Sequence, residues 1–277
     1  RSTLFPYTTL FRSASLADDI IYSSSTGANI TTEGYSLAQL YTYPTDGIDP
    51  QTGRRIVKIK KADGTYDRAL LIYKYGKGGA QLYEFDGETL SQYTMSDWKP
   101  EISGNTKPTY YGGWSNSFRY KNWDAKVNFH FSGGNKILNA MRATLSDGRM
   151  WSGTEEYYEN IWRQPGDHAK YAKASFNDNY SNGTANLISD LIEDGDFIRL
   201  QSLSIGYQFN TKKWSQEWGI SSVRLYAQAQ NLFCLTGYTG FDPEINSYYN
   251  EANLRSGIDL NTTPLTRTIT FGVNVSF

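Results

Sequence analysis

Two short acidic runs contain the residue types that hydrolytic chemistry needs. Glu155 and Glu156 are adjacent, and residues 193–196 read EDGD. Glycoside hydrolases use two carboxyl groups held roughly 5 to 9 Å apart, one as an acid and one as a base or nucleophile. Nothing in the sequence identifies a strand end or helix that would hold two of these carboxylates so, and EDGD, just before a predicted strand, is typical of a turn. We therefore expect no enzymatic activity.

The sequence also gives little support for a metal site, a cofactor site or nucleic-acid binding. His130 and His168 are far apart, with no cysteine, histidine or carboxylate at metal-ligand spacing. The glycine-rich run YGKGGAQ at residues 75–81 lacks the lysine–hydroxyl pair of a phosphate loop. The basic run RRIVKIKK at 54–61 is typical of a solvated hairpin arm, and the formal net charge is −1. We expect no cofactor, no metal and no nucleic-acid partner.

Aromatic residues are the remaining candidates for binding, at 15% of the chain. They gather in two long segments without a strand pattern. Such rings stack equally well on sugar rings and on peptide side chains, although packing of one loop against another is an equal alternative. The candidates for substrate or partner contacts are Trp151, Trp162, Tyr238, Phe241, Tyr248 and Tyr249.

The elements that must position these segments are strands. Strict alternation of apolar and polar residues predicts strands over Tyr110–Tyr120, Asp124–Ser132, Phe197–Phe209, Ser222–Phe233 and Arg267–Phe277. They are longer than the usual strand of about 5 to 6 residues. A tilted strand of roughly 9 to 11 residues is long enough to cross a lipid bilayer. No apolar stretch approaches the roughly 18 to 20 residues that a membrane-spanning helix needs.

The connections alternate between short and long. The first two strands are joined by little more than a turn, whereas residues 133–196 and 235–266 form long links. All long links then emerge at one end of the sheet, as in outer-membrane barrels with short periplasmic turns and long outer loops.

One face of the sheet is apolar and the other polar. If the apolar face meets lipid, the opposite register would push Lys126 and Arg224 into hydrocarbon, at about 2–4 kcal/mol each near the midplane. The alternative is a soluble β-sandwich, a carbohydrate-binding module, whose apolar face packs on a second sheet. The residues expected to face lipid are Ala125, Val127, Phe129, Phe131, Leu203, Ile205, Val223, Leu225, Val273 and Val275.

Three long motifs resemble a known family. DGDFIRLQSLSIGYQF (194–209), VRLYAQAQNLFCLTGYTGFDPE (223–244) and RTITFGVNVSF (267–277) together are similar to the C-terminal part of SusC-type (SusC/RagA) TonB-dependent outer-membrane transporters. GNTKPTYYGGWSNSFRYKNW (104–123), WRQPGD (162–167) and GIDPQTG (47–53) also fit. The similarity covers about residues 28–277. It implies an all-β, antiparallel up-and-down transmembrane β-barrel segment, the last strands of a barrel of about 22 strands.

The resemblance also implies a function and partners. Such proteins import oligosaccharides or peptides across the bacterial outer membrane, driven by a TonB complex, beneath a SusD-type surface lipoprotein that acts as a lid. The plug, the TonB-contacting segment and the first barrel strands are not in this sequence, so we expect a fragment that does not transport alone.

The domain organisation follows. Residues 1–13 resemble a translated sequencing adaptor and are expected to be a non-native tail. Residues 14–108 are expected to form an extracellular loop region, with short strands at LYTY, RRIVKIK and LLIYKY. Residues 109–277 are expected to form the barrel strands and two long outer loops, with a short helix near residues 153–163.

Overall fold

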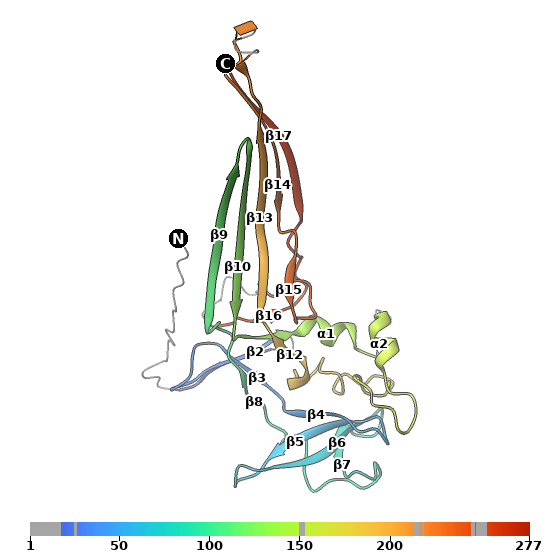
Figure 1. The fold of residues 1–277 in the computed structure, drawn as a ribbon. Helices are drawn as coiled ribbons and strands as arrows, with labels where there is room; N and C mark the ends of the chain where they lie inside the picture. The colour runs from blue at the N-terminus through green and yellow to red at the C-terminus, as the bar shows by residue number, and fades with distance from the viewer. Residues whose placement is uncertain are drawn as a thin grey trace.

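A tall antiparallel sheet dominates the fold (Figure 1). The computed structural model describes residues 18–24, 27–149, 153–212, 216–217, 219–244, 247 and 254–277, so the expected tail at 1–13 lies outside it. The sheet order is β17-β14-β13-β10-β9, with β15 (Cys234–Thr236) also paired to β13. Its long strands are β9 (Tyr110–Tyr120), β10 (Trp123–Gly133), β13 (Phe197–Gln208), β14 (Ser222–Gln230) and β17 (Thr268–Ser276). The five predicted strands are confirmed, with ends that differ by three residues or fewer.

The register of these strands places like residues side by side. Ala125 pairs with Phe118 and Ile205, and the row continues through Ala227 to Phe271. The neighbouring polar row contains Ser117, Lys126, Ser204, Gln228 and Thr270. Because a slip of one residue would exchange the faces, this pairing fixes which face is apolar.

The apolar face of the tall sheet is bare. Phe271 is 77% exposed, Val273 60% and Leu225 47%. The smaller sheets lie beyond one end of the tall sheet, not over its face (Figure 1). A β-sandwich needs a second sheet on this face, and the described part of the chain supplies none.

The opposite, polar face is cross-linked by an ion pair. Arg224 on β14 reaches across β13 and donates to Asp124 on β10, with Nε–Oδ1 and Nη2–Oδ2 distances of 3.0 and 2.5 Å. The side chain passes over Gly206, where an added Cβ would lie 2.3 Å from Nη2. The glycine of the SIGYQ motif therefore makes room for this contact.

Three smaller sheets and the helices labelled α1 and α2 gather at the end of the tall sheet where its long connections emerge (Figure 1). One sheet contains β1 (Ile20–Ser24), β2 (Gly27–Thr31), β3 (Gln39–Thr42) and β8 (Glu101–Gly104). A second contains β4 (Thr45–Ile48), β5 (Arg55–Lys60), β6 (Tyr66–Lys74) and β7 (Gly79–Tyr83). The third contains β12 (Ile192–Asp194), β11 (Lys136–Asn139) and β16 (Ile258–Asp259).

The helical elements are short. Those beside the smaller sheets are α1 (Ala140–Leu145), α2 (Glu155–Asn160) and the 3₁₀ turn η1 (Ser189–Leu191). The helix expected near residues 153–163 is confirmed as α2, which begins after Thr154, whose hydroxyl oxygen accepts from the Tyr157 N–H at 3.2 Å. Among the described residues no helix has the length and apolarity to cross a membrane.

The main hydrophobic core lies among these smaller elements. It joins residues from all three small sheets and from α1, including Leu40, Val57, Leu71, Trp98, Leu138, Ala140, Ile188 and Ile258. The expected short strands at LYTY, RRIVKIK and LLIYKY are confirmed as β3, β5 and β6. These smaller sheets and helices form one packed body with its own core, which we call the end domain. The sequence did not predict this packing.

Candidate functional site

The acidic runs considered for hydrolysis are occupied by structural contacts. Glu193 pairs with Arg142 at 2.8 Å, and Asp194 pairs with Lys136 at 2.5 Å. Asp196 accepts the Gly134 N–H at 2.7 Å, which ties β13 to the end of β10. Glu156 pairs with Lys170. No three histidine, cysteine or carboxylate side chains in the described ranges are grouped so that they could hold a metal ion.

Trp162, one of the six aromatic candidates, is buried. It is 6% exposed and packs with Ile48 and Ala172, and its indole N–H donates to the Pro50 carbonyl at 2.8 Å. The turn that supplies Pro50 is the GIDPQTG motif, which closes around the ring at Gly53. In this structure Trp162 therefore joins one loop to another.

We expect Gly53→Ala to destabilise this turn strongly. Gly53 has φ +70°, and an added Cβ would lie 2.3 Å from the Trp162 ring, so the variant combines backbone strain with a steric clash. Gly47→Ala is the matched control, because Gly47 has φ +78° but open space around it. The control carries about 1 kcal/mol of strain, whereas overpacking adds about 1–3 kcal/mol. Limited proteolysis of residues 44–54 measures the difference, and equal protection of the two variants would contradict this account.

Tyr238 is also buried, at 5% exposed. Its hydroxyl donates to Asp259 on β16 at 2.7 Å. Burial, reinforced by that hydrogen bond, raises the pKa of Tyr238, so the phenol keeps its proton. Its ring covers Gly240, where an added Cβ would lie 2.4 Å from it. Tyr238 thus fixes the loop that carries the next candidate.

Phe241 is the one of the six whose described ring is open to solvent, at 65% exposed. It lines a cleft of about 240 Å³ between α1, α2 and residues 239–241, hereafter the helix cleft. The other lining residues include Met141, Arg142, Leu145, Glu156, Tyr171 and Thr239. The remaining candidates, Trp151, Tyr248 and Tyr249, lie outside the described residues.

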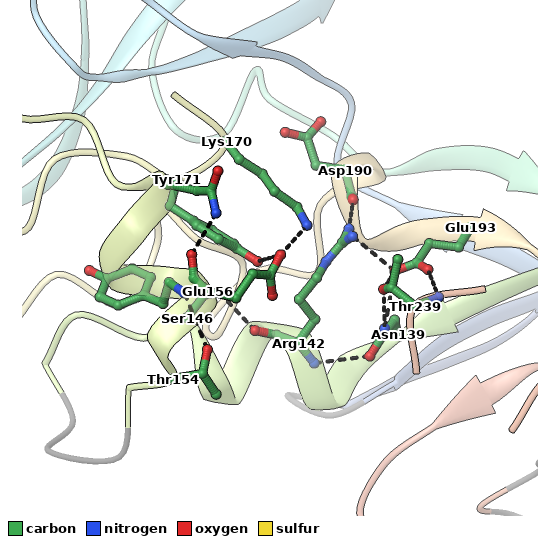
Figure 2. A network of polar contacts seen from close by, with 12 residues as sticks. Asn139, Arg142, Ser146, Thr154, Glu156, Lys170, Tyr171, Asp190, Glu193 and Thr239 are labelled. Atoms are coloured by element: carbon green, nitrogen blue, oxygen red, sulfur yellow. Dashed lines mark hydrogen bonds and ion pairs between the residues drawn. The ribbon is translucent and has the colours of Figure 1, made fainter. Parts of the chain in front are cut away.

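A polar network forms the wall of the helix cleft (Figure 2). Asn139 accepts the Arg142 N–H at 3.0 Å and thereby caps α1, and it donates to Glu193 at 3.0 Å. Arg142 also donates to the Asp190 carbonyl. Thr239 donates to Glu193 through its N–H at 2.7 Å and its hydroxyl at 2.8 Å. Three segments distant in sequence therefore meet at the carboxylate of Glu193, whose side chain is 10% exposed.

The second part of the network surrounds Glu156 (Figure 2). Its carboxylate accepts from Lys170 and, at 3.2 Å, from the Tyr171 hydroxyl. The hydrogen bond from Lys170 lowers the pKa of Glu156, whereas burial raises the pKa of Tyr171. The acidic group is thus ionised and engaged at neutral pH. Charged groups that are already held by structural partners, beside the exposed ring of Phe241, suit ligand binding better than proton transfer.

A second ion cluster attaches the same loop to the tall sheet. Arg199 on β13 is 5% exposed and pairs with Asp242 at 2.5 Å and with Glu244 at 2.6 Å. His130 on β10 lies 3.3 Å from the other oxygen of Glu244. Arg199 belongs to the FIRL motif, and Asp242 and Glu244 belong to the FDPE motif, so ion pairs join these two motifs.

Sequence reasoning did not single out the residues of these clusters as a site. Asn139 and Arg142 belong to no motif, Thr239 lies unremarked inside the 223–244 motif, and their partners come from separate segments. Glu193 drew attention through EDGD, but for hydrolysis instead of loop assembly.

Curated proteins related in sequence are receptors. The chain is 30% identical over 270 residues to TonB-dependent receptor P3 of Formosa agariphila, covering 94% of this chain and 25% of that protein. It is 31% identical over 96 residues to TonB-dependent receptor SusC of Bacteroides thetaiotaomicron, covering 34% of this chain and 9% of SusC. The chain spans about a quarter of the length of TonB-dependent receptor P3. No protein-family model matches it.

Solved structures share the fold. A structure of the RagAB peptide transporter superposes with a TM-score of 0.65 at 20% identity, over 94% of this chain and 25% of that one. The RagAB peptide importer in its 'closed-closed' state gives a TM-score of 0.61 at 20% identity, over 94% and 25%. The mostly antiparallel β fold and the sequence relatives agree with the motifs noted above. The chain therefore belongs to the SusC-type TonB-dependent receptors.

Proposed function

We propose that this chain is the C-terminal portion of an outer-membrane β-barrel transporter that imports oligosaccharides or peptides. The bare apolar face of the tall sheet carries the proposal. Water does not favour a row of exposed residues such as Leu225, Phe271 and Val273, whereas the hydrocarbon core of a bilayer does. The polar face, with Lys126, Gln228 and the Arg224–Asp124 pair, would line the interior of a barrel closed by strands outside this chain.

The end domain would stand outside the cell. Residues 14–108 and the links 133–196 and 235–266 would form this outer layer, and the long strands within residues 109–277 would supply the barrel wall. Aromatic side chains near the opposite end of the strands would mark the membrane interface there. Tyr120, Trp123 and Tyr207 are among them, with Trp123 and Tyr207 in contact at 4.9 Å between ring centroids.

The partners follow from this placement. A SusD-type lipoprotein would cover the end domain, and a TonB complex would act through a plug outside this chain. The chain would have no enzymatic activity of its own, because the carboxylates that line the helix cleft are engaged by structural partners.

The test is uptake by the full-length protein. Deletion of its gene should abolish growth on the oligosaccharide or peptide that it imports, and the full-length gene should restore it. Phe241→Ala should lower uptake at limiting substrate about tenfold, because an aromatic contact in a binding site contributes about 0.5–1.5 kcal/mol beyond the area it buries. Leu90→Ala is the control, since Leu90 is 57% exposed and does not line the helix cleft. Growth that is independent of the gene on all such substrates would contradict the proposal.

A further inference from the structure

The terminal strand β17 lies at the edge of the tall sheet (Figure 1). In the described part of the chain it pairs with β14 and with no other strand, from Ser222–Ser276 to Gln230–Thr268. Every residue of β17 except Gly272, at its centre, is exposed. Within this chain, the position of β17 therefore depends on its contacts with β14.

Alternation of apolar and polar residues does not fix that position completely. A slip of one residue would exchange the two faces of β17, but a slip of two residues would keep them. Ala227 pairs with Phe271. After a slip of two residues it would lie opposite Ile269 or Val273, which are also apolar. Another feature must select one register among those that differ by two residues.

The ring of Tyr226 supplies that feature. On the polar face Tyr226 pairs with Gly272, and its ring extends over the glycine. An added Cβ at Gly272 would lie 2.3 Å from the ring carbon Cζ and 2.4 Å from the hydroxyl oxygen. The ring therefore occupies the space that a side chain would need. An aromatic ring that covers a glycine of the neighbouring strand compensates for the packing that the glycine lacks.

The neighbouring positions of the polar row cannot accept the ring in the same way. A slip of two residues would place Tyr226 opposite Thr270 or Asn274, whose side chains need the space that the ring fills. On the other side of β14, Gly206 is already covered by Arg224, whose Cζ lies 5.4 Å from the centroid of the Tyr226 ring. The ring thus fits the observed register of β17 better than either neighbouring register.

The register of this pair matters for the whole of the proposed barrel. In a closed barrel the number of strands, their tilt and their shear are linked. A slip of two residues between β14 and β17 would change the shear. It would also shift every hydrogen bond between β17 and the strand that closes the barrel, which lies outside this chain.

We propose that the contact between Tyr226 and Gly272 sets the register of β17 on β14 as the barrel closes. Tyr226 is the positioning residue, and Gly272 leaves the space for its ring. The inference rests on the proposed barrel, and it identifies two residues outside the end domain on which correct assembly depends.

Disulfide trapping in the full-length protein measures the register. Cys234 and any cysteine outside this chain are replaced by serine, and an oxidant is added to growing cells to trap the strands as they assemble. Gln228→Cys with Thr270→Cys reports the observed register, because these residues are paired. Gln228→Cys with Thr268→Cys, and Gln230→Cys with Thr270→Cys, report slips of two residues in the two directions. Diagonal neighbours, about 7–8 Å apart, are too distant for a disulfide, which needs Cβ atoms about 3.5–4.5 Å apart.

Tyr226→Ala and Gly272→Ala should each lower the ratio of native to slipped cross-links about threefold or more, since each removes one cross-strand contact. Tyr226→Phe keeps the ring and should keep the ratio. Gly113→Ala is the matched control, because an added Cβ there would meet the Phe129 carbonyl oxygen at 3.3 Å and no side chain within 4 Å. The control should leave the ratio unchanged.

Three results would overturn the inference. They are an unchanged ratio in Tyr226→Ala and Gly272→Ala, a loss in Tyr226→Phe as large as that in Tyr226→Ala, or an equal loss in Gly113→Ala. If Gly272→Ala does not accumulate, the double variant Tyr226→Ala/Gly272→Ala has no ring to clash. It should accumulate again while its ratio stays low, and failure of either expectation would count against the contact.

Uptake separates this failure from failure of the proposed function. A protein that imports its substrate, and whose variants keep the native register, refutes only the role of Tyr226 and Gly272. A parent protein that neither forms the native cross-link in the outer membrane nor imports a substrate refutes the proposed barrel itself.

Discussion

Ile269→Arg in the full-length protein should prevent its accumulation in the outer membrane. Ile269 on β17 is 61% exposed on the bare apolar face and pairs with Ala229, in a row that continues through Leu203 to Val127 about halfway along the tall strands. An arginine on the lipid face of a barrel costs about 2–4 kcal/mol at the midplane. That loss is comparable to a large part of the stability of an ordinary domain, and the side chain would meet hydrocarbon in every assembled molecule.

Gln228→Arg is the control for this prediction. Gln228 lies on the polar face of the neighbouring strand β14, between Ser204 and Thr270. The same charge there would face a wet interior, so we expect normal amounts in the membrane. Heat-modifiable migration and membrane fractionation measure folded protein in both variants. Equal accumulation of the two, or loss of Gln228→Arg alone, would mean that the apolar face does not meet lipid.

The tall sheet could be predicted because the pattern that identifies each strand lies within that strand. A period of two over nine or more residues identifies a strand and its faces without reference to any partner. The apolar side of β14 is visible in the sequence as Val223, Leu225, Ala227 and Ala229, and the structure pairs each with apolar residues of β17.

The end domain could not be predicted in the same way, because its contacts join distant segments. Asn29 donates to the Ser256 carbonyl across 227 residues, and Arg55 meets Asp190 across 135. Its strands are short, and α1 has only six residues, too few to show a helical period. Sequence patterns identified β3, β5 and β6, but could not reveal that one core holds them together.

At the candidate site, the composition of a loop does not show whether its aromatic residues pack or bind. Aromatic residues in a long loop are equally consistent with packing and with binding, and the structure contains both. Trp162 and Tyr238 are buried between loops, whereas Phe241, three residues after Tyr238, is exposed in the helix cleft.

Arg199→Met should release the loop that carries Phe241. Arg199 and Asp242 have side chains only 6% and 4% exposed, so the substitution leaves a buried carboxylate without its cation. Breaking a buried pair from one side costs about 3–5 kcal/mol. Since the tall sheet has many other contacts, the loop around Asp242 and Glu244 should open while the sheet persists. Hydrogen exchange of peptides from residues 234–244 should accelerate by about two to three orders of magnitude, since each 1.4 kcal/mol corresponds to a factor of ten.

Two further variants test whether the faster exchange comes from the buried ion cluster or from a general loss of stability. Lys136→Met removes an exposed pair, since Lys136 and Asp194 have side chains 43% and 70% exposed, and such pairs contribute about 0–1 kcal/mol. Exchange in the loop should then be unchanged. Arg199→Met combined with Asp242→Leu removes both buried charges and should recover part of the lost protection, because the unpaired carboxylate causes most of the cost. Unchanged exchange in Arg199→Met alone would show that the FIRL and FDPE motifs do not hold this loop to the strand wall.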